Sequence, residues 1–223
     1  MASWMVHLRM ADRLLSEIPG LDETAFIMGN MAPDSGVPNE DWSHFTPSIA
    51  VSRFQNKDIP NGKHIDISAF AGRYFTKGQR NKYDSKQYSF FLGYLCHLLT
   101  DIAWADQIFL PSMEKFAQGA SDRNNVIAAI KEDWYDLDYL YLREHPDFRA
   151  FQRYRNLGSF PNTCMTEFPT DAFDNRRAYI VDFYLQENDH LDREYPYLTA
   201  AQADEFVEKT VSAIKAELSQ GNY

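Results

Sequence analysis

Apolar residues recur at helical spacing along most of the chain. In the first segment His7, Ala11, Leu14 and Ile18 fall on one stripe, while charged residues occupy the other faces. Pro19-Gly20 ends this pattern, as expected where a helix stops. Nowhere does the sequence alternate apolar and polar residues convincingly enough to indicate a strand. The pattern therefore predicts an all-α protein.

Capping signals and turn-rich segments divide the chain into about seven or eight helices. Asp22 can cap a helix that stops before Pro33, and Thr199-Ala-Ala-Gln202 is a capping-box pattern at the start of the last helix. Two long irregular segments lie between helices, at about 32–62 and 156–173. Length and pattern together suit one domain over 1–223. The helices expected after the first are 23–31, about 64–76, 84–110, 124–144, 175–190 and 199–218.

The segment over 84–110 is apolar on nearly every face, which is typical of a buried central helix. His97 and Asp101 lie inside it, four residues apart. An ionised carboxylate there must be neutralised, paired or bound to a metal, because isolating it from water costs several kcal/mol. Residues four apart on a helix have Cβ atoms roughly 5–6 Å apart, so an imidazole and a carboxylate can share one cation. The alternative is a buried pair in which His97 and Asp101 each find another polar partner.

Three further residues extend this candidate site. Asp34 lies in a long, aromatic-rich loop that we expect to fold down over the protein, because loops of this length in compact domains are usually functional. His44 has aromatic neighbours, and His7 lies on the apolar stripe of the first helix. Nitrogen and oxygen ligands without cysteine suit a hydrolytic zinc-type centre rather than a structural zinc site. Two of these residues also have an ordinary explanation, as a turn residue for Asp34 and as a core residue for His7.

Charge and composition limit the expected partners. Asp and Glu number 32 against 22 Lys and Arg, giving a formal net charge of −10 that no Lys/Arg-rich run offsets. Nucleic acid is therefore not an expected partner, whereas a small phosphoester remains compatible with the chain. The stretch MASWMVHLRMADRLL is amphipathic rather than a secretion signal, and no apolar run is long enough to cross a bilayer. Two cysteines are too few for a disulfide framework, and Cys96 is expected to be a buried thiol. These features predict a cytoplasmic protein.

The order of the motifs resembles that of the zinc-dependent phospholipase C family, whose all-α fold is shared with single-strand-specific zinc nucleases. The sequence has a His in the first helix, then Gly-x-x-x-Pro-Asp, a Ser-His-Phe element, and Gly-x-x-x-His-x-x-x-Asp in the buried helix. The resemblance implies one metal surrounded by Asp34, His44, His97 and Asp101. It also implies that Asp101 bridges towards a second metal held in part by His7. A bound water would attack the phosphorus of a phosphodiester, with Asp34 as the catalytic residue that orients or deprotonates it.

Several positions depart from the family pattern. The family uses a mature N-terminal Trp as a metal ligand, whereas Trp4 here lies behind Met-Ala-Ser. Where the family places another His shortly after the helix Asp, this chain has Asp106 and Gln107. The helix that should supply His-x-x-x-Glu carries acids instead, of which Asp136 is the preferred inward-facing ligand and a solvated residue is the alternative. Zn²⁺ is the expected ion, in one to three copies, but fewer imidazoles would also admit Mn²⁺, Fe²⁺ or Mg²⁺.

The sequence as a whole predicts a metal-dependent phosphoester hydrolase of the zinc-dependent phospholipase C type, with metal-activated water as the nucleophile. A small soluble phosphoester suits this acidic chain, which has no recognisable apolar lid, better than a phospholipid does. The alternative from another class is a family member with a degenerate or structural metal site that works as a binding or interaction module. A helical phosphohydrolase of the His-Asp type is disfavoured, because the chain has no adjacent His-Asp dipeptide.

Overall fold

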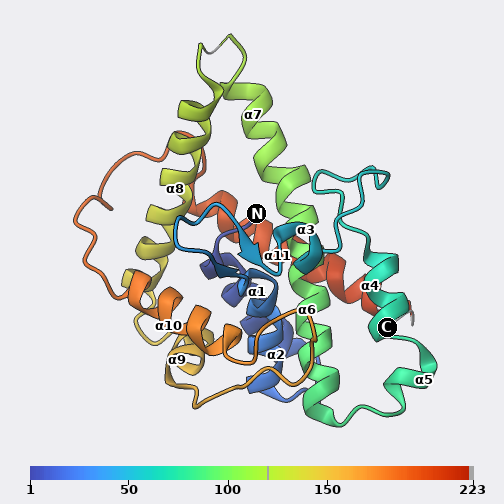
Figure 1. The fold of residues 1–223 in the computed structure, drawn as a ribbon. Helices are drawn as coiled ribbons and strands as arrows, with labels where there is room; N and C mark the ends of the chain where they lie inside the picture. Colours follow the sequence, from blue (N-terminus) through green and yellow to red (C-terminus); the bar gives the residue numbers. More distant parts are fainter. Residues whose placement is uncertain (120, 221–223) are drawn as a thin grey trace.

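Helix α6 (Ser85–Trp104) runs through the middle of the molecule, and other helices pack around it (Figure 1). The structure is a computed structural model that describes residues 1–119 and 121–220. Asp84 starts α6 with a capping box: its side chain accepts a hydrogen bond from the backbone N–H of Gln87, and the Gln87 side chain accepts one from the backbone N–H of Asp84. Most side chains of α6 are buried. The predicted all-α fold is confirmed, and its central helix is buried as expected.

The first two helices each begin at a capping residue. α1 (Trp4–Glu17) starts after Ser3, whose hydroxyl accepts a hydrogen bond from the backbone N–H of Val6, and it ends before the Pro-Gly turn. α2 (Glu23–Met31) has the predicted cap, Asp22. Both helices pack against α6, so residues near the beginning of the chain lie at the centre of the molecule.

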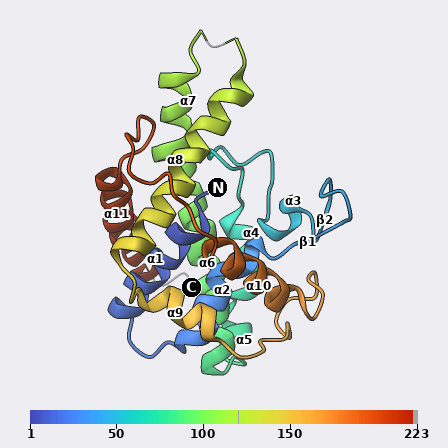
Figure 2. The ribbon, with the colours of Figure 1, turned by 90° about the vertical axis from the view of Figure 1, so that its left-hand side faces the viewer.

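The second half of the chain forms longer helices around α1 and α6. α7 (Leu110–Phe116) and α8 (Arg123–Glu144) form a hairpin that projects from the rest of the molecule (Figures 1 and 2). A wide helical turn, η2 (Ala105–Phe109), joins α6 to α7, so the helical path continues to 116 rather than ending near the predicted residue 110. α11 (Ala200–Ser219) opens with the predicted capping box and packs against α1.

Two helices differ from the prediction. α9 (Arg149–Asn156) falls outside the predicted helices, although its buried residues Ala150, Phe151 and Tyr154 do recur at helical spacing. The helix expected over 175–190 is α10 (Ala172–Tyr184), which ends earlier. After Tyr184 the chain becomes polar and largely exposed, so no apolar stripe is left to hold a further helical turn against the core.

The segment expected to be irregular over 32–62 folds into short elements that lie against the helices. They are η1 (Ala32–Asp34), the antiparallel strands β1 (Val37–Pro38) and β2 (Phe45–Thr46), and α3 (Ile49–Ser52). Strands of two residues are too short to show alternation, which is why the sequence did not predict them. The hydroxyl of Tyr94 in α6 donates a hydrogen bond to the carbonyl of Ser52 and ties α3 to the central helix.

A shorter helix forms within the segment predicted to be helical at about 64–76, and a second short helix follows that segment. They are α4 (Ile67–Tyr74) and α5 (Lys77–Arg80).

Cys96 is fully buried, as expected for a structural thiol. Among the described helices, none combines the length and the apolar character needed to cross a membrane.

Two glycines allow α2 and α6 to approach very closely. A Cβ atom at Gly29 would lie 1.9 Å from the carbonyl oxygen of Phe90, and one at Gly93 would lie 2.2 Å from the carbonyl oxygen of Phe26. Both neighbours are helix backbone, which cannot move aside as a flexible side chain can. The glycines therefore fix the distance between α2, which leads into Asp34, and α6, which carries His97.

We predict that Gly93→Ala lowers the free energy of unfolding by about 1–3 kcal/mol, the usual cost of overpacking a core. The reason is that the two helix backbones must move apart to make room for the Cβ atom. Gly72→Ala in α4 is the matched control: a Cβ there meets nothing within 4 Å, and alanine favours a helix. Urea unfolding of both variants measures the difference. Equal stability of the two variants would show that the crossing is not closely packed.

Candidate metal centre

Four of the predicted site residues meet in one buried cluster. His7 comes from α1, Asp34 from η1, and His97 and Asp101 from α6. The two imidazole rings stack, with centroids 3.7 Å apart and planes 7° apart. Nε2 of His7 lies 3.5 Å from Oδ1 of Asp101, and Nε2 of His97 lies 3.5 Å from Oδ2 of Asp101. Nε2 of His97 is also 3.9 Å from Oδ1 of Asp34.

The hydrogen bonds around the cluster determine which imidazole nitrogen can act as a ligand. Nδ1 of His97 lies 2.7 Å from the carbonyl oxygen of Asn30 in α2. A carbonyl can only accept, so Nδ1 carries the proton and the lone pair of neutral His97 is on Nε2. This type of hydrogen bond orients metal-ligating histidines in other proteins. The backbone N–H of Ala2 donates to Oδ1 of Asp101 at 3.0 Å and adds a further support to that carboxylate.

Three imidazole nitrogens of the cluster have no hydrogen-bond partner among the described residues. They are Nδ1 and Nε2 of His7 and Nε2 of His97. Burying an unsatisfied polar group costs about 1–3 kcal/mol, so such atoms usually have a role. Ligand atoms of His7, Asp34 and His97 lie within 4.8 Å of one another. Two imidazoles with one or two carboxylates make a nitrogen and oxygen donor set that suits Zn²⁺. These residues therefore fit a metal ion, and they could bind one together.

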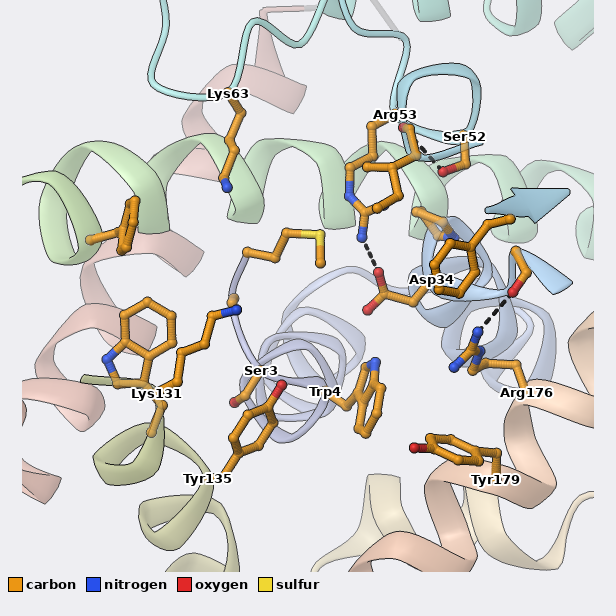
Figure 3. A pocket seen from close by; sticks show the side chains of 18 of the residues that line it. Ser3, Trp4, Asp34, Ser52, Arg53, Lys63, Lys131, Tyr135, Arg176 and Tyr179 are labelled. Carbon is orange, nitrogen blue, oxygen red and sulfur yellow. Dashed lines mark hydrogen bonds and ion pairs between the residues drawn. The ribbon is translucent and has the colours of Figure 1, made fainter. Parts of the chain in front are cut away.

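Arg53 supplies a positive charge to the same cluster. Its guanidinium is 2% exposed and lies between the two carboxylates. Nε donates to Oδ2 of Asp101 at 2.9 Å, and Nη2 pairs with Oδ1 of Asp34 (Figure 3). The buried charge is thus −2 from Asp34 and Asp101 against +1 from Arg53, which leaves one negative charge for a bound cation to balance.

The electrostatic environment holds the cluster in a ligand-competent state. Burial tends to raise the pKa of Asp34 and Asp101, but Arg53 and the two histidines outweigh it and hold both pKa values below their usual range. Burial and the neighbouring His97 lower the pKa of His7 to about 4. At neutral pH the carboxylates are therefore ionised and His7 is neutral, which are the protonation states that metal binding requires.

The structure places the two remaining predicted ligands elsewhere. His44 lies exposed in the turn between β1 and β2, where its Nδ1 is 2.7 Å from the hydroxyl of Ser43. Asp136 faces inward, but its Oδ2 accepts hydrogen bonds from Nε and Nη2 of Arg193 at 3.0 and 2.8 Å. Neither residue joins the cluster. Their role as metal ligands stays a prediction from the family resemblance.

Arg53 is the residue of the cluster that the sequence did not reveal. It is a single cation in the stretch Pro47–Phe54, between short apolar and hydroxyl side chains. That isolation is the only local signal of its burial, and it says nothing about which carboxylates Arg53 meets. The partners come from η1 and from α6, 19 and 48 residues away in the chain.

A pocket of about 470 Å³ lies beside the cluster, and Asp34 and Arg53 belong to both (Figure 3). His7, His97 and Asp101 are behind these two residues and do not line the pocket. The walls carry several aromatic rings, and the remaining charged side chains are all basic. The aromatic residues are Trp4, Trp42, Phe45, Phe109, Trp134, Tyr135 and Tyr179, and the basic ones besides Arg53 are Lys63, Lys131 and Arg176.

The order of the cluster residues along the chain agrees with a known family. Residues 6–104 match the family model of zinc dependent phospholipase C. The resemblance found in the motifs is thereby confirmed over this stretch, which reaches from α1 to the end of α6 and contains the whole cluster. No curated protein and no solved structure matches the chain. The zinc-dependent phospholipase C match and the possible His/Asp metal site support a metal-dependent hydrolase at the family level.

We expect Arg53→Gln to destabilise the metal-free protein by about 3–5 kcal/mol, because it leaves two buried carboxylates without their cation. Added Zn²⁺ should then raise the melting temperature of this variant more than that of the wild type, since the ion replaces the lost charge.

Arg193→Gln is the matched control for Arg53→Gln. Arg193 also lies between two carboxylates, Asp133 and Asp136, but among the described residues no group of three possible ligands forms there. Its loss should lower stability without recovery on adding Zn²⁺. If Zn²⁺ stabilises both variants and the wild type equally, the ion does not bind between Asp34 and Asp101.

Acid should destabilise the metal-free protein through His7. Its pKa is about 4 when folded and 6.5 otherwise, so the unfolded state binds more protons between these values. The free energy of unfolding should therefore fall as the pH drops from 6.5 towards 4, by roughly 3 kcal/mol in total. Urea unfolding with a chelator at pH 7 and pH 4 measures this loss. It should be smaller in His7→Gln and unchanged in His145→Gln, which alters an exposed histidine; an equal loss in all three proteins would contradict the assignment.

Proposed function

We propose that the protein is a metal-dependent hydrolase of a small soluble phosphoester. The observation that carries the proposal is a pair of buried imidazoles with unpartnered nitrogens, next to carboxylates whose pKa values are held low, directly behind a pocket lined by cations. The match to zinc dependent phospholipase C over 6–104 supports the reaction class. The basic lining of the pocket supports an anionic substrate.

His7, His97, Asp34 and Asp101 are the residues that would hold the ion. A divalent cation at this position supplies a Lewis acid, which neutralises charge on a phosphate and lowers the pKa of water. The charge of the cluster favours one ion per chain: the net charge of −1 becomes +1 with one divalent cation and would become +3 with a second. A buried site with three uncompensated positive charges is unfavourable.

Asp34 and Arg53 are the residues of the cluster that can touch a substrate, because both also line the pocket. Asp34 is ionised and can accept a hydrogen bond from the attacking water, which orients it towards the phosphorus. Arg53 presents a guanidinium that can pair with phosphate oxygens while it keeps its bond to Asp101. Asp101 is fully buried and serves as an anchor for His7, His97 and Arg53.

A second candidate function is a binding module in which the cluster is structural. The observation that favours it is Arg53, which already neutralises part of the carboxylate charge without any metal. On this alternative the pocket binds an anionic ligand and no bond is broken. A protein that binds metal and phosphate but hydrolyses neither a phosphodiester nor a phosphomonoester would favour the binding module.

We predict that Asp34→Asn lowers the rate of phosphodiester hydrolysis about 10²–10⁴-fold, the usual contribution of a group that handles a proton. His97→Gln should lower both the rate and the number of metal ions per chain. The assay uses bis(p-nitrophenyl) phosphate and p-nitrophenyl phosphate, with elemental analysis of each purified variant. Wild type without metal or activity would contradict the proposed function.

His44→Ala and Asp136→Asn are the controls for this experiment, because both residues lie away from the cluster. They should keep the metal content and the activity of the wild type. If His44→Ala loses metal as His97→Gln does, the ligand set implied by the family resemblance is correct and the cluster geometry is not the functional one.

A further inference from the structure

Most of the charged side chains that line the pocket are basic. Besides Asp34, the charged residues that line it are Arg53, Lys63, Lys131 and Arg176. The chain as a whole has a net charge of −10, so this local excess of positive charge reverses the overall balance. A cavity wall that carries one sign of charge concentrates ligands of the opposite sign.

Both arginines bind oxygen atoms of the protein, whereas neither lysine forms an ion pair in the described part of the chain. Arg53 is paired with Asp34 and Asp101, and Arg176 donates to the carbonyl of Gly36 at 2.7 Å. In the part of the chain that the structure describes, the lysines that form ion pairs are Lys209 and Lys215, both in α11. Among the described residues, Lys63 and Lys131 thus have no anionic partner; the amine of Lys63 lies beside the N-terminal amine of Met1, which is no counter-charge for it.

Lys63 is held in place by its backbone. The preceding residue, Gly62, donates its N–H to Oδ1 of Asp106 at 2.9 Å, and the side chain of Gln55 donates to the carbonyl of Lys63 at 3.2 Å. The amine of Lys63 lies 5.7 Å from the ring centre of Phe109. These contacts keep the lysine at the pocket wall rather than free in solvent.

Lys131 reaches the pocket from the opposite wall. It belongs to α8, and Figure 3 shows the amines of Lys63 and Lys131 extending from opposite walls into the same, left-hand part of the pocket. Asp34 and Arg176 lie on the other side of that view. The pocket therefore has two cationic regions, one next to the candidate metal centre and one at the two lysines.

We propose that Lys63 and Lys131 form a subsite for a second anionic group, so that the substrate is a small molecule with two anionic groups. This inference rests on the proposed function for the position of the scissile phosphoester near Asp34 and Arg53. The volume of about 470 Å³ is large enough for a sugar-sized molecule between the two regions. Trp4, Tyr135 and Tyr179 would cover its uncharged part. A substrate with a cationic head group would be repelled by four basic side chains, in spite of the aromatic walls.

The test compares fructose 1,6-bisphosphate, fructose 6-phosphate and phosphocholine as probes of the metal-loaded protein. Binding is followed by tryptophan fluorescence immediately after mixing, since Trp4, Trp42 and Trp134 line the pocket. We expect the bisphosphate to bind at least tenfold more tightly than the monophosphate, because its second phosphate forms charge-assisted hydrogen bonds with the two lysines. Phosphocholine should bind most weakly of the three.

The variants Lys63→Gln and Lys131→Gln should each weaken binding of the bisphosphate about tenfold and leave that of the monophosphate within about twofold. Lys115→Gln is the matched control, because Lys115 lies in α7 over the ring of Phe116 and does not line the pocket. Equal binding of the two sugar phosphates, tighter binding of phosphocholine, or no effect of either lysine overturns the subsite.

The same measurements separate this inference from the proposed function. Tighter, lysine-dependent binding of the bisphosphate without hydrolysis of any phosphoester would support the subsite and overturn the hydrolase. If the protein hydrolyses the p-nitrophenyl substrates but neither lysine substitution weakens binding of the bisphosphate, the hydrolase is supported and the subsite is overturned.

Discussion

The burial of one carboxylate, that of Asp101, organises the centre of this protein. A charge removed from water is tolerated only when it is paired and hydrogen-bonded on all sides. Asp101 is contacted by the backbone N–H of Ala2, by the imidazoles of His7 and His97, and by the guanidinium of Arg53. These partners come from the start of the chain, from α1, from α6 and from the segment after α3. One ionised group thus requires four separate parts of the chain to be in place together.

The close approach of α2 and α6 serves the same centre. α2 supplies the carbonyl of Asn30 that holds the proton on Nδ1 of His97, and it leads directly into η1, which carries Asp34. Gly29 and Gly93 let the two helices come near enough for this hydrogen bond of 2.7 Å to form. Helix packing and the choice of imidazole tautomer are therefore linked, because a wider crossing would move the acceptor away from His97.

Sequence periodicity identified the parts of the site that lie on regular elements. The helical spacing of His97 and Asp101 placed both on one face of α6, and the apolar stripe of α1 placed His7 towards the core. The sequence pattern could not predict which partners from distant parts of the chain these side chains contact. Asp136 does face inward, but whether a buried acid meets a metal or an arginine depends on Arg193, 57 residues further along the chain.

The aromatic neighbours of His44 illustrate a second limit of sequence patterns. They suggested burial, yet Trp42 is 49% exposed and the turn that carries His44 lies at the surface. Aromatic residues near a pocket belong to its wall as readily as to the core, and a local pattern does not distinguish the two. Trp42 and Phe45 line the pocket, so the same aromatic residues that suggested burial of His44 help to form the pocket wall.

Arg53 connects the two halves of the site and determines how they influence each other. Its guanidinium faces Asp34 and Asp101 on one side and the pocket on the other. An anion bound in the pocket would pair with the guanidinium of Arg53. Arg53 would then neutralise Asp34 and Asp101 less, so these carboxylates would attract a metal ion more strongly. By linkage, a metal ion at the carboxylates frees Arg53 to bind the anion to the same extent. On the proposed function, the cluster would take one ion and one anionic substrate together, with Arg53 shared between them, whereas two divalent ions alone would over-neutralise it.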